Sequence, residues 1–452
     1  MSIISEAECT AQSLTIQQAI DEAHRCLLCH DAPCSQCCPG GTDPGKFIRQ
    51  IRFYNLKGAA RTVLRNNPLG TVCAHVCPTE ETCVGACLRA GMDRPIDIEG
   101  LQNFAAEYGR EHGVHALEPG NARPERIAII GAGPAGLVAA ARLATFGYKV
   151  TIFEAQEQAG GMLRYGIPKT RLPESVLKAD LEEILSLGVE LHCNKELQDE
   201  GSAIKLLEDG FAAVFVAPGL WKPYELTLPG IDLQGVTNAI KFLGDMHNSP
   251  DKAASLVKDK NIAIIGGGSV AMDVALGARE LGAKRIYAIA LESMTELPAQ
   301  EKELAQARQD GVIFKPQCQL TRIVGDKGNV SGVEGVETEW IKTGKLTPDN
   351  ARPIEGTSFR LRVGAVIQAI GQGPSEIAQK IVVSAKKTGA LLFADKTTQS
   401  TSVKRIFAGG DIVRGAGTVI DAVGDGKRAA DAIHQLLSKN RSQNPGPSQV
   451  RQ

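Results

Sequence analysis

The sequence lacks an excess of either charge, a long apolar run and an export signal. Lys and Arg number 50 and Asp and Glu number 51, so the formal net charge is −1. A surface that follows phosphate groups needs a cationic excess, so we expect no nucleic-acid partner. The longest uncharged apolar stretch lies between Arg126 and Arg142. It is shorter than the ~20 residues of a membrane-spanning helix. Residues 1–14 include two glutamates and lack the basic and apolar regions of a signal peptide, so we expect a cytoplasmic protein with no membrane association.

Aromatic residues are also scarce, at 4%, whereas glycine is abundant, at 48 of 452 residues. This balance favours an α/β architecture with tight phosphate-binding turns over a module that binds by ring stacking. The length suggests about three domains.

Cysteine is concentrated at one end, with ten of the twelve cysteines in the first 87 residues. Because cytosolic thiols stay reduced, this density indicates metal binding more than a disulfide framework. The spacing is C-x2-C-x4-C-x3-C-P from Cys26 to Pro39 and C-x3-C-x5-C-x3-C from Cys73 to Cys87. It is similar to ferredoxin runs, in which three close cysteines bind one cube and a fourth, before proline, binds a second. We predict two [4Fe–4S] clusters in a helical domain, with structural zinc or redox-sensing thiols as alternatives.

A dinucleotide-binding unit begins after residue 125. The apolar run 127–130 is typical of a buried parallel strand, and the glycines of G-x-G-x-x-G follow it at Gly131, Gly133 and Gly136. The first glycine permits the tight turn, the second lets a pyrophosphate approach the backbone, and the third lets the helix pack on the strand. The N-terminus of that helix offers N–H groups and a positive dipole end. A second strand ends at Glu154, whose carboxylate can accept hydrogen bonds from ribose hydroxyls.

The same unit recurs 135 residues later, with Gly266 in place of Gly131 and Glu292 after the second strand. Two such units in one chain indicate FAD in one and a nicotinamide cofactor in the other. We assign FAD to the first, because residues 160–173 could cover a flavin and residues 405–413 resemble the late FAD motif of two-dinucleotide flavoproteins. The candidate FAD residues are Gly131, Ala132, Gly133, Pro134, Ala135, Gly136, Glu154, Gly161, Met162, Arg171, Gly410, Asp411 and Thr418. The candidate NAD residues are Gly266, Gly267, Gly268, Ser269, Val270, Glu292 and Gly371.

These signals predict an α/β two-dinucleotide-binding flavoprotein, with one Rossmann-like domain inserted in the other and an N-terminal α-helical iron–sulfur domain. We interpret the apolar strands within 212–219 and 365–371 as the crossings between the two Rossmann-like domains. The expected boundaries are 1–124 for the clusters, 125–228 and 365–440 for FAD, 229–364 for NAD, and 441–452 for a disordered tail.

Neither dinucleotide unit has a C-x-x-C beside it, so the redox cysteines of a disulfide reductase are missing and the clusters remain as the route for electrons. Residues 26–39, 67–87, 95–102 and 166–173 together resemble the N-terminal half of dihydropyrimidine dehydrogenase. Length and end points resemble its bacterial electron-input subunits, the PreT type. The resemblance covers about Gln17 to Leu437. The glutamate synthase small subunit shares the same plan, but its second cysteine block differs in flanking sequence.

The resemblance implies a ligand set for each cluster. One set comes from the first three cysteines of the run and the last of the second block. The other combines the cysteine before proline, two cysteines of the second block and an unusual glutamine, with Cys73 as the rival to that glutamine. Carried onto this sequence, the sets are Cys26, Cys29, Cys34 and Cys87 for the first cluster, and Cys38, Cys77, Cys83 and Gln102 for the second.

The resemblance also implies that the chain oxidises NADH through FAD and feeds a PreA-type partner subunit, in a heterotetramer. That partner would hold FMN and iron–sulfur clusters and would interconvert uracil or thymine with the 5,6-dihydropyrimidines. No room remains here for a further barrel of ~250 residues. We nominate no catalytic side chain, because hydride transfer needs no general acid. Glu292 favours NAD over NADP, since a carboxylate suits a free 2′-hydroxyl and repels a 2′-phosphate. The alternatives are a glutamate synthase small subunit, an electron donor to another reductase, and a non-enzymatic iron–sulfur redox sensor or assembly module.

Overall fold

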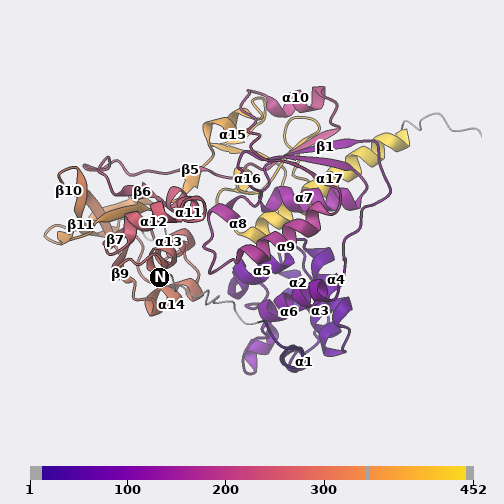
Figure 1. Cartoon of the computed structure of the whole chain (residues 1–452), viewed down its shortest axis with the longest axis horizontal. Helices are drawn as coiled ribbons and strands as arrows, with labels where there is room; N and C mark the ends of the chain where they lie inside the picture. Colours follow the sequence, from indigo (N-terminus) through magenta and orange to yellow (C-terminus); the bar gives the residue numbers. More distant parts are fainter. Residues whose placement is uncertain (1–12, 343, 345–346, 444–452) are drawn as a thin grey trace, which may run out of the picture. The chain divides into compact units, whose positions relative to one another are not determined.

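Contacts between residues divide the chain into two compact units, and each is described by itself. The larger unit holds residues 1–163, 169–220 and 374–452, and the smaller unit holds residues 164–168 and 221–373. The structure is a computed structural model that describes residues 13–342, 344 and 347–443 (Figure 1).

The N-terminal part of the larger unit is helical, and four of its helices begin at a residue whose side chain caps the first turn. Thr15 forms a capping box with Gln18, and the side chains of Asp43, Asn55 and Asp97 each accept from a backbone N–H in the first turn of a later helix. The helices are α1 (Ile16–His24), α2 (Pro33–Gln36), α3 (Pro44–Arg52), α4 (Leu56–Asn66), α5 (Gly70–Val76) and α6 (Ile98–Glu111), with 3-10 turns at Thr79–Glu81 and Leu88–Gly91. Their common core includes the buried side chains of Ala19, Phe47, Ile51, Val63, Leu101 and Phe104.

A five-stranded parallel sheet forms the rest of the larger unit, in the order β18-β4-β1-β2-β3. Its central strands are apolar and buried because helices cover both faces. Helices α7 and α17 lie side by side on one face and α10 lies on the other (Figure 1). The strands are β1 (Arg126–Ile130), β2 (Lys149–Phe153), β3 (Glu190–His192), β4 (Ala213–Val216) and β18 (Ile406–Ala408). The helices are α7 (Pro134–Thr145), α9 (Glu174–Leu185), α10 (Ser202–Glu208), α15 (Glu376–Lys380), α16 (Asp411–Arg414) and α17 (Val419–Gln443). A short hairpin joins β16 (Lys387–Thr388) to β17 (Leu391–Leu392), and α8 spans Met162–Tyr165.

The smaller unit has a second parallel sheet, in the order β6-β14-β7-β8-β9, and an antiparallel sheet of four strands. The parallel strands are β6 (Val236–Asn238), β7 (Asn261–Ile265), β8 (Arg285–Ile289), β9 (Ile313–Lys315) and β14 (Ala365–Gln368). The helices are α11 (Ala239–Asn248), α12 (Pro250–Val257), α13 (Ser269–Glu280) and α14 (Glu301–Gln309). The antiparallel strands are β10 (Cys318–Asp326), β11 (Asn329–Trp340), β12 (Ala351–Pro353) and β13 (Phe359–Leu361), with a 3-10 turn at Pro348–Asn350.

The division between the units differs from the boundaries expected from sequence. Strand β14, which the sequence assigns to the returning FAD part, pairs with β6 and β7 in the sheet of the smaller unit. The two units divide after residues 220 and 373 rather than 228 and 364. The antiparallel pair β5 (Lys222–Pro223) and β15 (Gln372–Gly373) lies at these crossings. A short buried apolar run does not reveal which of two parallel sheets it joins, and this is why the sequence misplaced β14.

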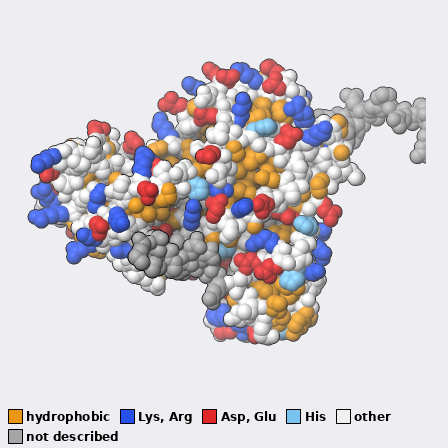
Figure 2. Space-filling model, in the orientation of Figure 1, with side chains coloured by type: hydrophobic (Ala, Val, Ile, Leu, Met, Phe, Trp, Pro, Cys, Tyr) orange, Lys and Arg blue, Asp and Glu red, His pale blue; other side chains and the backbone are white. Residues whose placement is uncertain are grey.

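Two further expectations concern the C-terminus and membranes. Helix α17 continues to Gln443, so residues 441–443 are helical and not a disordered tail, whereas residues 444–452 lie outside the described residues. Among the described helices, none combines the length and the apolar composition that a bilayer crossing requires. On the face drawn in Figure 2, Lys and Arg are interspersed with Asp and Glu, in line with the near-zero net charge.

Candidate cofactor sites

The four cysteines assigned to the first cluster line one cavity in the helical part of the larger unit. Its empty volume is about 420 Å³, part of it open to solvent. Burial, together with the nearby Cys26 and Cys87 thiols, raises the pKa of Cys34 to about 11. Leu27 and Leu88 line the same cavity and are 43% and 57% exposed. The cavity therefore combines crowded thiols with an apolar rim at the surface.

A second cavity, of about 380 Å³, is lined by the three cysteines assigned to the second cluster and also by Cys73 and Gln102. Burial and the Cys38 thiol raise the pKa of Cys83 to about 12. A hydrogen bond with Cys73, together with burial, raises the pKa of the Cys77 thiol. Thiolates held this close repel one another, so they need a cationic centre between them.

The two cavities fit iron–sulfur cubes better than single ions. No three His, Cys, Asp or Glu side chains in the described part of the chain are placed to hold one metal ion. A zinc ion draws its thiolates to ~2.3 Å from a single point, whereas a cube of four irons and four sulfides holds its ligands further apart. Cys37 lines neither cavity, and its exposed Sγ lies 3.5 Å from the Cys34 carbonyl oxygen.

Gln102 is held in a fixed orientation on α6. Its Nε2 donates to the Gly70 carbonyl oxygen at 2.7 Å, and the residue is buried. The amide nitrogen is thus engaged, and the amide oxygen is the atom of this side chain that could bind iron. Glu99, which the sequence reasoning missed, also lines this cavity and accepts a hydrogen bond from the Thr79 hydroxyl at 2.7 Å. The structure brings Gln102 and Cys73 to the same cavity.

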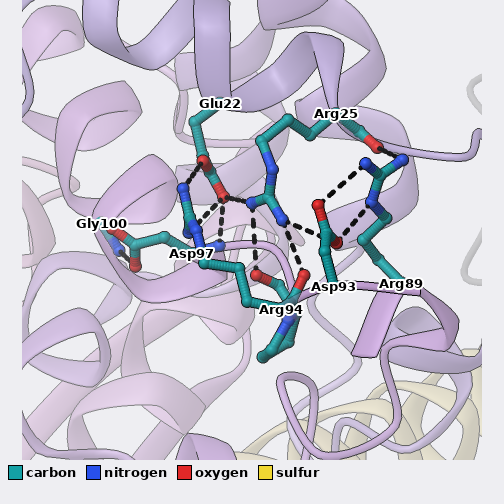
Figure 3. A network of polar contacts seen from close by, with 8 residues as sticks. Glu22, Arg25, Arg89, Asp93, Arg94, Asp97 and Gly100 are labelled. Atoms are coloured by element: carbon teal, nitrogen blue, oxygen red, sulfur yellow. Dashed lines mark hydrogen bonds and ion pairs between the residues drawn. The ribbon is translucent and has the colours of Figure 1, made fainter. Parts of the chain in front are cut away.

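A polar network locks the segment between Cys87 and α6 onto α1 (Figure 3). Buried Glu22 accepts from the Arg25 and Arg94 guanidinium groups at 2.5 and 2.8 Å and from the Asp97 backbone N–H at 2.9 Å. Burial alone would raise the pKa of Glu22, but these hydrogen bonds and charges hold it below its usual value. Arg25 Nη2 also donates to the Asp93 carboxylate at 3.1 Å, which completes the network. Because Arg25 precedes Cys26, the network joins two segments that carry candidate metal ligands.

The first glycine turn has the geometry expected of a dinucleotide site. Gly131 has φ +101°, and a Cβ there would lie 2.4 Å from the Ala217 carbonyl oxygen. A Cβ at Gly136 would lie 2.0 Å from the Gly131 carbonyl oxygen, so α7 could not pack this closely with any larger residue. A Cβ at Gly133 would meet no described atom within 4 Å, which leaves the space that a pyrophosphate needs at the N-terminus of α7.

Glu154 is buried after β2 and supports this turn. Its carboxylate accepts from the backbone N–H groups of Ala132 at 2.6 Å and Gln156 at 2.8 Å. Burial raises the pKa of Glu154, and the hydrogen bonds from Gln156 and Ala132 act against that rise. Gly161 has φ +54°, and a Cβ there would lie 2.9 Å from the Gly133 Cα. The structure thus brings Gly133, Glu154 and Gly161 together around one turn.

The C-terminal motif lies at the start of α16 and is supported by a carboxylate that the sequence reasoning missed. Burial raises the pKa of Asp411 to about 7. Asp425, on α17 and 1% exposed, accepts from the Gly410 backbone N–H at 2.8 Å and from Arg414 Nη2 at 2.6 Å. No sequence motif marks Asp425, because its partners lie in a different element of the chain.

Two candidate FAD residues make other contacts. Arg171 Nη2 lies 3.5 Å from the Val76 carbonyl oxygen, next to Cys77 in the helical part. The hydroxyl of Thr418 accepts from the Asp421 N–H at 3.3 Å, as a cap of α17 does, and donates to the Asp421 carboxylate at 2.6 Å. Both remain candidates for the flavin.

The second glycine turn, in the smaller unit, repeats the geometry of the first. A Cβ at Gly266, where φ is +129°, would lie 2.3 Å from the Ala369 carbonyl oxygen, and a Cβ at Gly267 would lie 2.3 Å from Leu297 Cδ2. Gly268 precedes Ser269, the first residue of α13, and Val270 in the first turn is 42% exposed. Glu292 is half-buried in the loop after β8. Gly371, with φ +99°, lies beside the Tyr224 ring.

Comparisons with known proteins match the helical, cysteine-rich part and the dinucleotide-binding part to two families. Residues 4–114 match the family model described as dihydropyrimidine dehydrogenase domain II, 4Fe-4S cluster, and residues 125–426 match the pyridine nucleotide-disulphide oxidoreductase family. The NAD-dependent dihydropyrimidine dehydrogenase subunit PreT of Escherichia coli K12 is 40% identical over 428 residues, which cover 93% of this chain and 94% of that protein. The NADP(+)-dependent formate dehydrogenase subunit beta of Moorella thermoacetica is 37% identical over 90% of this chain and 60% of its own length.

A solved structure confirms the predicted fold class. FprA from Mycobacterium tuberculosis, in a His57Gln mutant form, has a TM-score of 0.60 at 18% identity, covering 72% of this chain and 86% of that one. The comparisons also confirm the predicted cofactor types, FAD, NAD(H) and iron–sulfur clusters. The chain belongs to the pyridine nucleotide-disulphide oxidoreductase family and, within it, to the PreT-type subunits of NAD-dependent dihydropyrimidine dehydrogenase.

Proposed function

We propose that this chain is the NADH-oxidising, electron-input subunit of a heteromeric dihydropyrimidine dehydrogenase. The observation that carries the proposal is the union, in one chain, of two glycine turns shaped for dinucleotides and two cavities lined by cysteine. When bound, FAD supplies the change from hydride to single-electron chemistry, and iron–sulfur clusters supply one-electron conduction.

The chain's own residues bind and orient these groups. Gly133 and Gly268 leave the backbone open to a pyrophosphate at a helix N-terminus. Glu154 holds the first turn through two backbone N–H groups and keeps lone pairs for ribose hydroxyls. Asp411, half-buried at the start of α16, would hydrogen-bond the ribityl chain.

For the metal centres we propose Cys26, Cys29, Cys34 and Cys87 as one ligand set and Cys38, Cys77, Cys83 and Gln102 as the other. The anchored amide of Gln102 supports the second set. A neutral amide oxygen stabilises oxidised iron less than a thiolate does, so Gln102→Cys should lower the reduction potential of the second cluster. Cys73→Ser should leave the iron content of the chain unchanged. Loss of one cluster's iron in Cys73→Ser would assign the ligand to Cys73.

The pyrimidine site belongs, in this proposal, to a PreA-type FMN and iron–sulfur subunit with which the chain forms a heterotetramer. Every sheet among the described residues is accounted for by the two dinucleotide folds and their connections. Leu27 and Leu88, exposed at the rim of the first cavity, give that partner an apolar surface beside a metal centre. The gathering of cysteines around two candidate metal cavities, in place of a disulfide framework, fits a reduced, cytoplasmic location.

The test is NADH-dependent loss of uracil, with the purified chain alone and with its partner. We expect the chain alone to bind about one FAD and eight irons and to reduce artificial acceptors, but to consume uracil only after the partner is added. Uracil turnover by the single chain, shown by mass spectrometry to be free of partner, would overturn the proposal.

A second candidate function is electron donation to another reductase or dehydrogenase. The 37% identity to a formate dehydrogenase subunit favours it. The same assay is therefore repeated with other substrates, each with the co-purified partner. These are formate with NAD⁺ or NADP⁺, and glutamine with 2-oxoglutarate. A redox sensor without an enzymatic role would need no hydride donor, and the complete nicotinamide turn counts against it.

A further inference from the structure

Lys427 on α17 is directed into the helical part of the larger unit. Its Nζ donates to the Gly40 carbonyl oxygen at 2.6 Å and to the Asn66 carbonyl oxygen at 2.9 Å. Gly40 lies two residues after Cys38, and the Gly41 N–H donates back to the Cys38 carbonyl oxygen at 3.0 Å. The ammonium group is therefore held by the turn that presents a proposed ligand of the second cluster.

One face of α17 presses on that same turn. Ile420 lines the second cysteine cavity, and a Cβ at Gly424 would lie 2.5 Å from the Pro39 carbonyl oxygen. Ile420, Gly424 and Lys427 are spaced four and three residues apart, so they share one side of the helix. The placement of Lys427 is thus fixed by the packing of the whole helix and not by a flexible side chain alone.

The positive charge at Lys427 is not cancelled locally. The ionisable groups that act on its charge are Arg142, the Cys38 thiol and Asp431, and Arg142 and Asp431 pair with each other at 2.5 Å. Across the described residues no carboxylate pairs with Lys427; its contacts are carbonyl oxygens. Burial lowers the pKa of Lys427, Arg142 lowers it further, and the Cys38 thiol acts against this. A half-buried cation held only by carbonyls is costly, which calls for a compensating negative group nearby.

We propose that Lys427 supplies a fixed positive charge beside the second cluster and so raises the reduction potential of that cluster. Reduction adds one negative charge to the site, and a cation held in a low-dielectric environment stabilises the reduced state. The inference rests on the proposed function, because it requires a cluster held by Cys38.

The experiment is an EPR-monitored redox titration of the full chain loaded with FAD and iron. Lys427→Gln keeps an N–H donor for the carbonyls and removes the charge, whereas Lys427→Arg keeps both. At a fixed potential, Lys427→Gln should reduce the ratio of reduced to oxidised second cluster about tenfold, which is 59 mV for a one-electron couple. Lys427→Arg should stay within about twofold of the unaltered chain. Lys178→Gln, an exposed lysine on α9 of the same unit, is the matched control and should change nothing.

The outcomes separate the charge from a purely structural tether. A lower thermal midpoint in Lys427→Gln with an unchanged potential would overturn the inference and leave Lys427 as a tether. Lys427→His gives a second test, in which one variant is measured at two pH values. As pH falls from 8 to 6, the reduction potential of its second cluster should rise more than that of the unaltered chain, since the imidazole then becomes charged. Equal pH dependence in the two proteins would also overturn it. If the unaltered chain binds only one cluster, the proposed ligand sets fail, and this result is distinct from an unchanged potential.

Discussion

The carboxylate of Glu292 stands in the loop after β8, where the second strand of a dinucleotide fold meets the adenosine ribose. We predict that Glu292→Arg narrows or reverses a preference for NADH over NADPH, by about tenfold in the ratio of kcat/KM values, because it replaces a repulsive charge by an attractive one. The measurement is acceptor reduction by the chain alone with each nucleotide. Glu292→Gln only removes the repulsion, so its ratio of kcat/KM values should lie between those of the unaltered chain and Glu292→Arg. Equal use of NADPH by the unaltered chain would show that Glu292 does not select the nucleotide.

Asp180 on α9 is a buried carboxylate with a strongly displaced pKa. It accepts from the Thr71 hydroxyl at 2.8 Å and the Val72 N–H at 3.0 Å, at the start of α5. Burial raises its pKa to about 6 from 3.8, and the hydrogen bonds from Val72 and Thr71 limit that rise. Because the pKa is higher in the folded state, protonated Asp180 stabilises the fold by roughly 3 kcal/mol relative to the ionised form. This stability is fully present below pH ~4 and is lost as pH rises through ~6.

We therefore expect the thermal midpoint of the unaltered chain, relative to that of Asp180→Asn, to fall as pH rises from about 4 to about 7. Asn does not titrate, so the variant lacks this component. Asp199→Asn serves as the control, because the Lys205 ammonium holds the pKa of Asp199 below its usual value and nothing titrates there in this pH range. A midpoint difference between the unaltered chain and Asp180→Asn that does not change with pH would contradict the assignment.

At the scale of elements, α17 joins the flavin motif to the second cysteine cavity. A Cβ at Gly426 would lie 2.3 Å from the Ala135 carbonyl oxygen at the N-terminus of α7, and one at Gly424 would lie 2.5 Å from the Pro39 carbonyl oxygen. We predict that Gly426→Ala lowers FAD occupancy more than iron content, and that Gly424→Ala lowers iron content more than FAD occupancy. Flavin absorbance after gel filtration and iron analysis measure the two.

Gly244→Ala on α11 is the matched control for this pair. A Cβ there would meet no described atom within 4 Å, so the change should be neutral or stabilise the helix by up to ~1 kcal/mol. If Gly424→Ala and Gly426→Ala lower FAD and iron equally, α17 acts as one rigid support and the two contacts are not separable.

The contacts of α17 also show which features the sequence alone could not predict. The glycine turns and the acids after the second strands were predictable, because the chain order strand, turn, helix and strand places them within about 25 residues of one another. Cysteine spacing likewise predicted two clusters, and the family resemblance supplied the grouping of the cysteines that line each cavity. Lys427 and Gly40 are 387 residues apart, and Asp180 and Thr71 are 109 apart. Neither pair belongs to a periodic pattern, so only the folded chain reveals these contacts. The assignment of β14 failed for the same reason, since pairing partners are not encoded in a short apolar run.

At the scale of the whole molecule, the proposed metal ligands and the dinucleotide turns belong to separate elements. Cys34 lies in α2, whereas the two glycine turns precede α7 and α13. A defect at one cysteine cavity should therefore leave nucleotide binding intact and interrupt only the transfer of electrons from the flavin to a partner.

We predict that Cys34→Ser keeps NADH-dependent reduction of the flavin within about twofold of the unaltered chain, since its glycine turns are unchanged. The same variant should lower partner-linked uracil reduction at least tenfold, because a serine hydroxyl is a poor replacement for a thiolate on iron. Flavin bleaching in a stopped-flow instrument and NADH-dependent uracil loss with the proposed PreA-type partner measure the two activities. The control is Cys37→Ser, whose exposed thiol lines neither cavity and should leave both activities unchanged. Undiminished uracil reduction by Cys34→Ser would show that electrons reach the partner without the first cavity, and the route from this chain would then have to leave through the second.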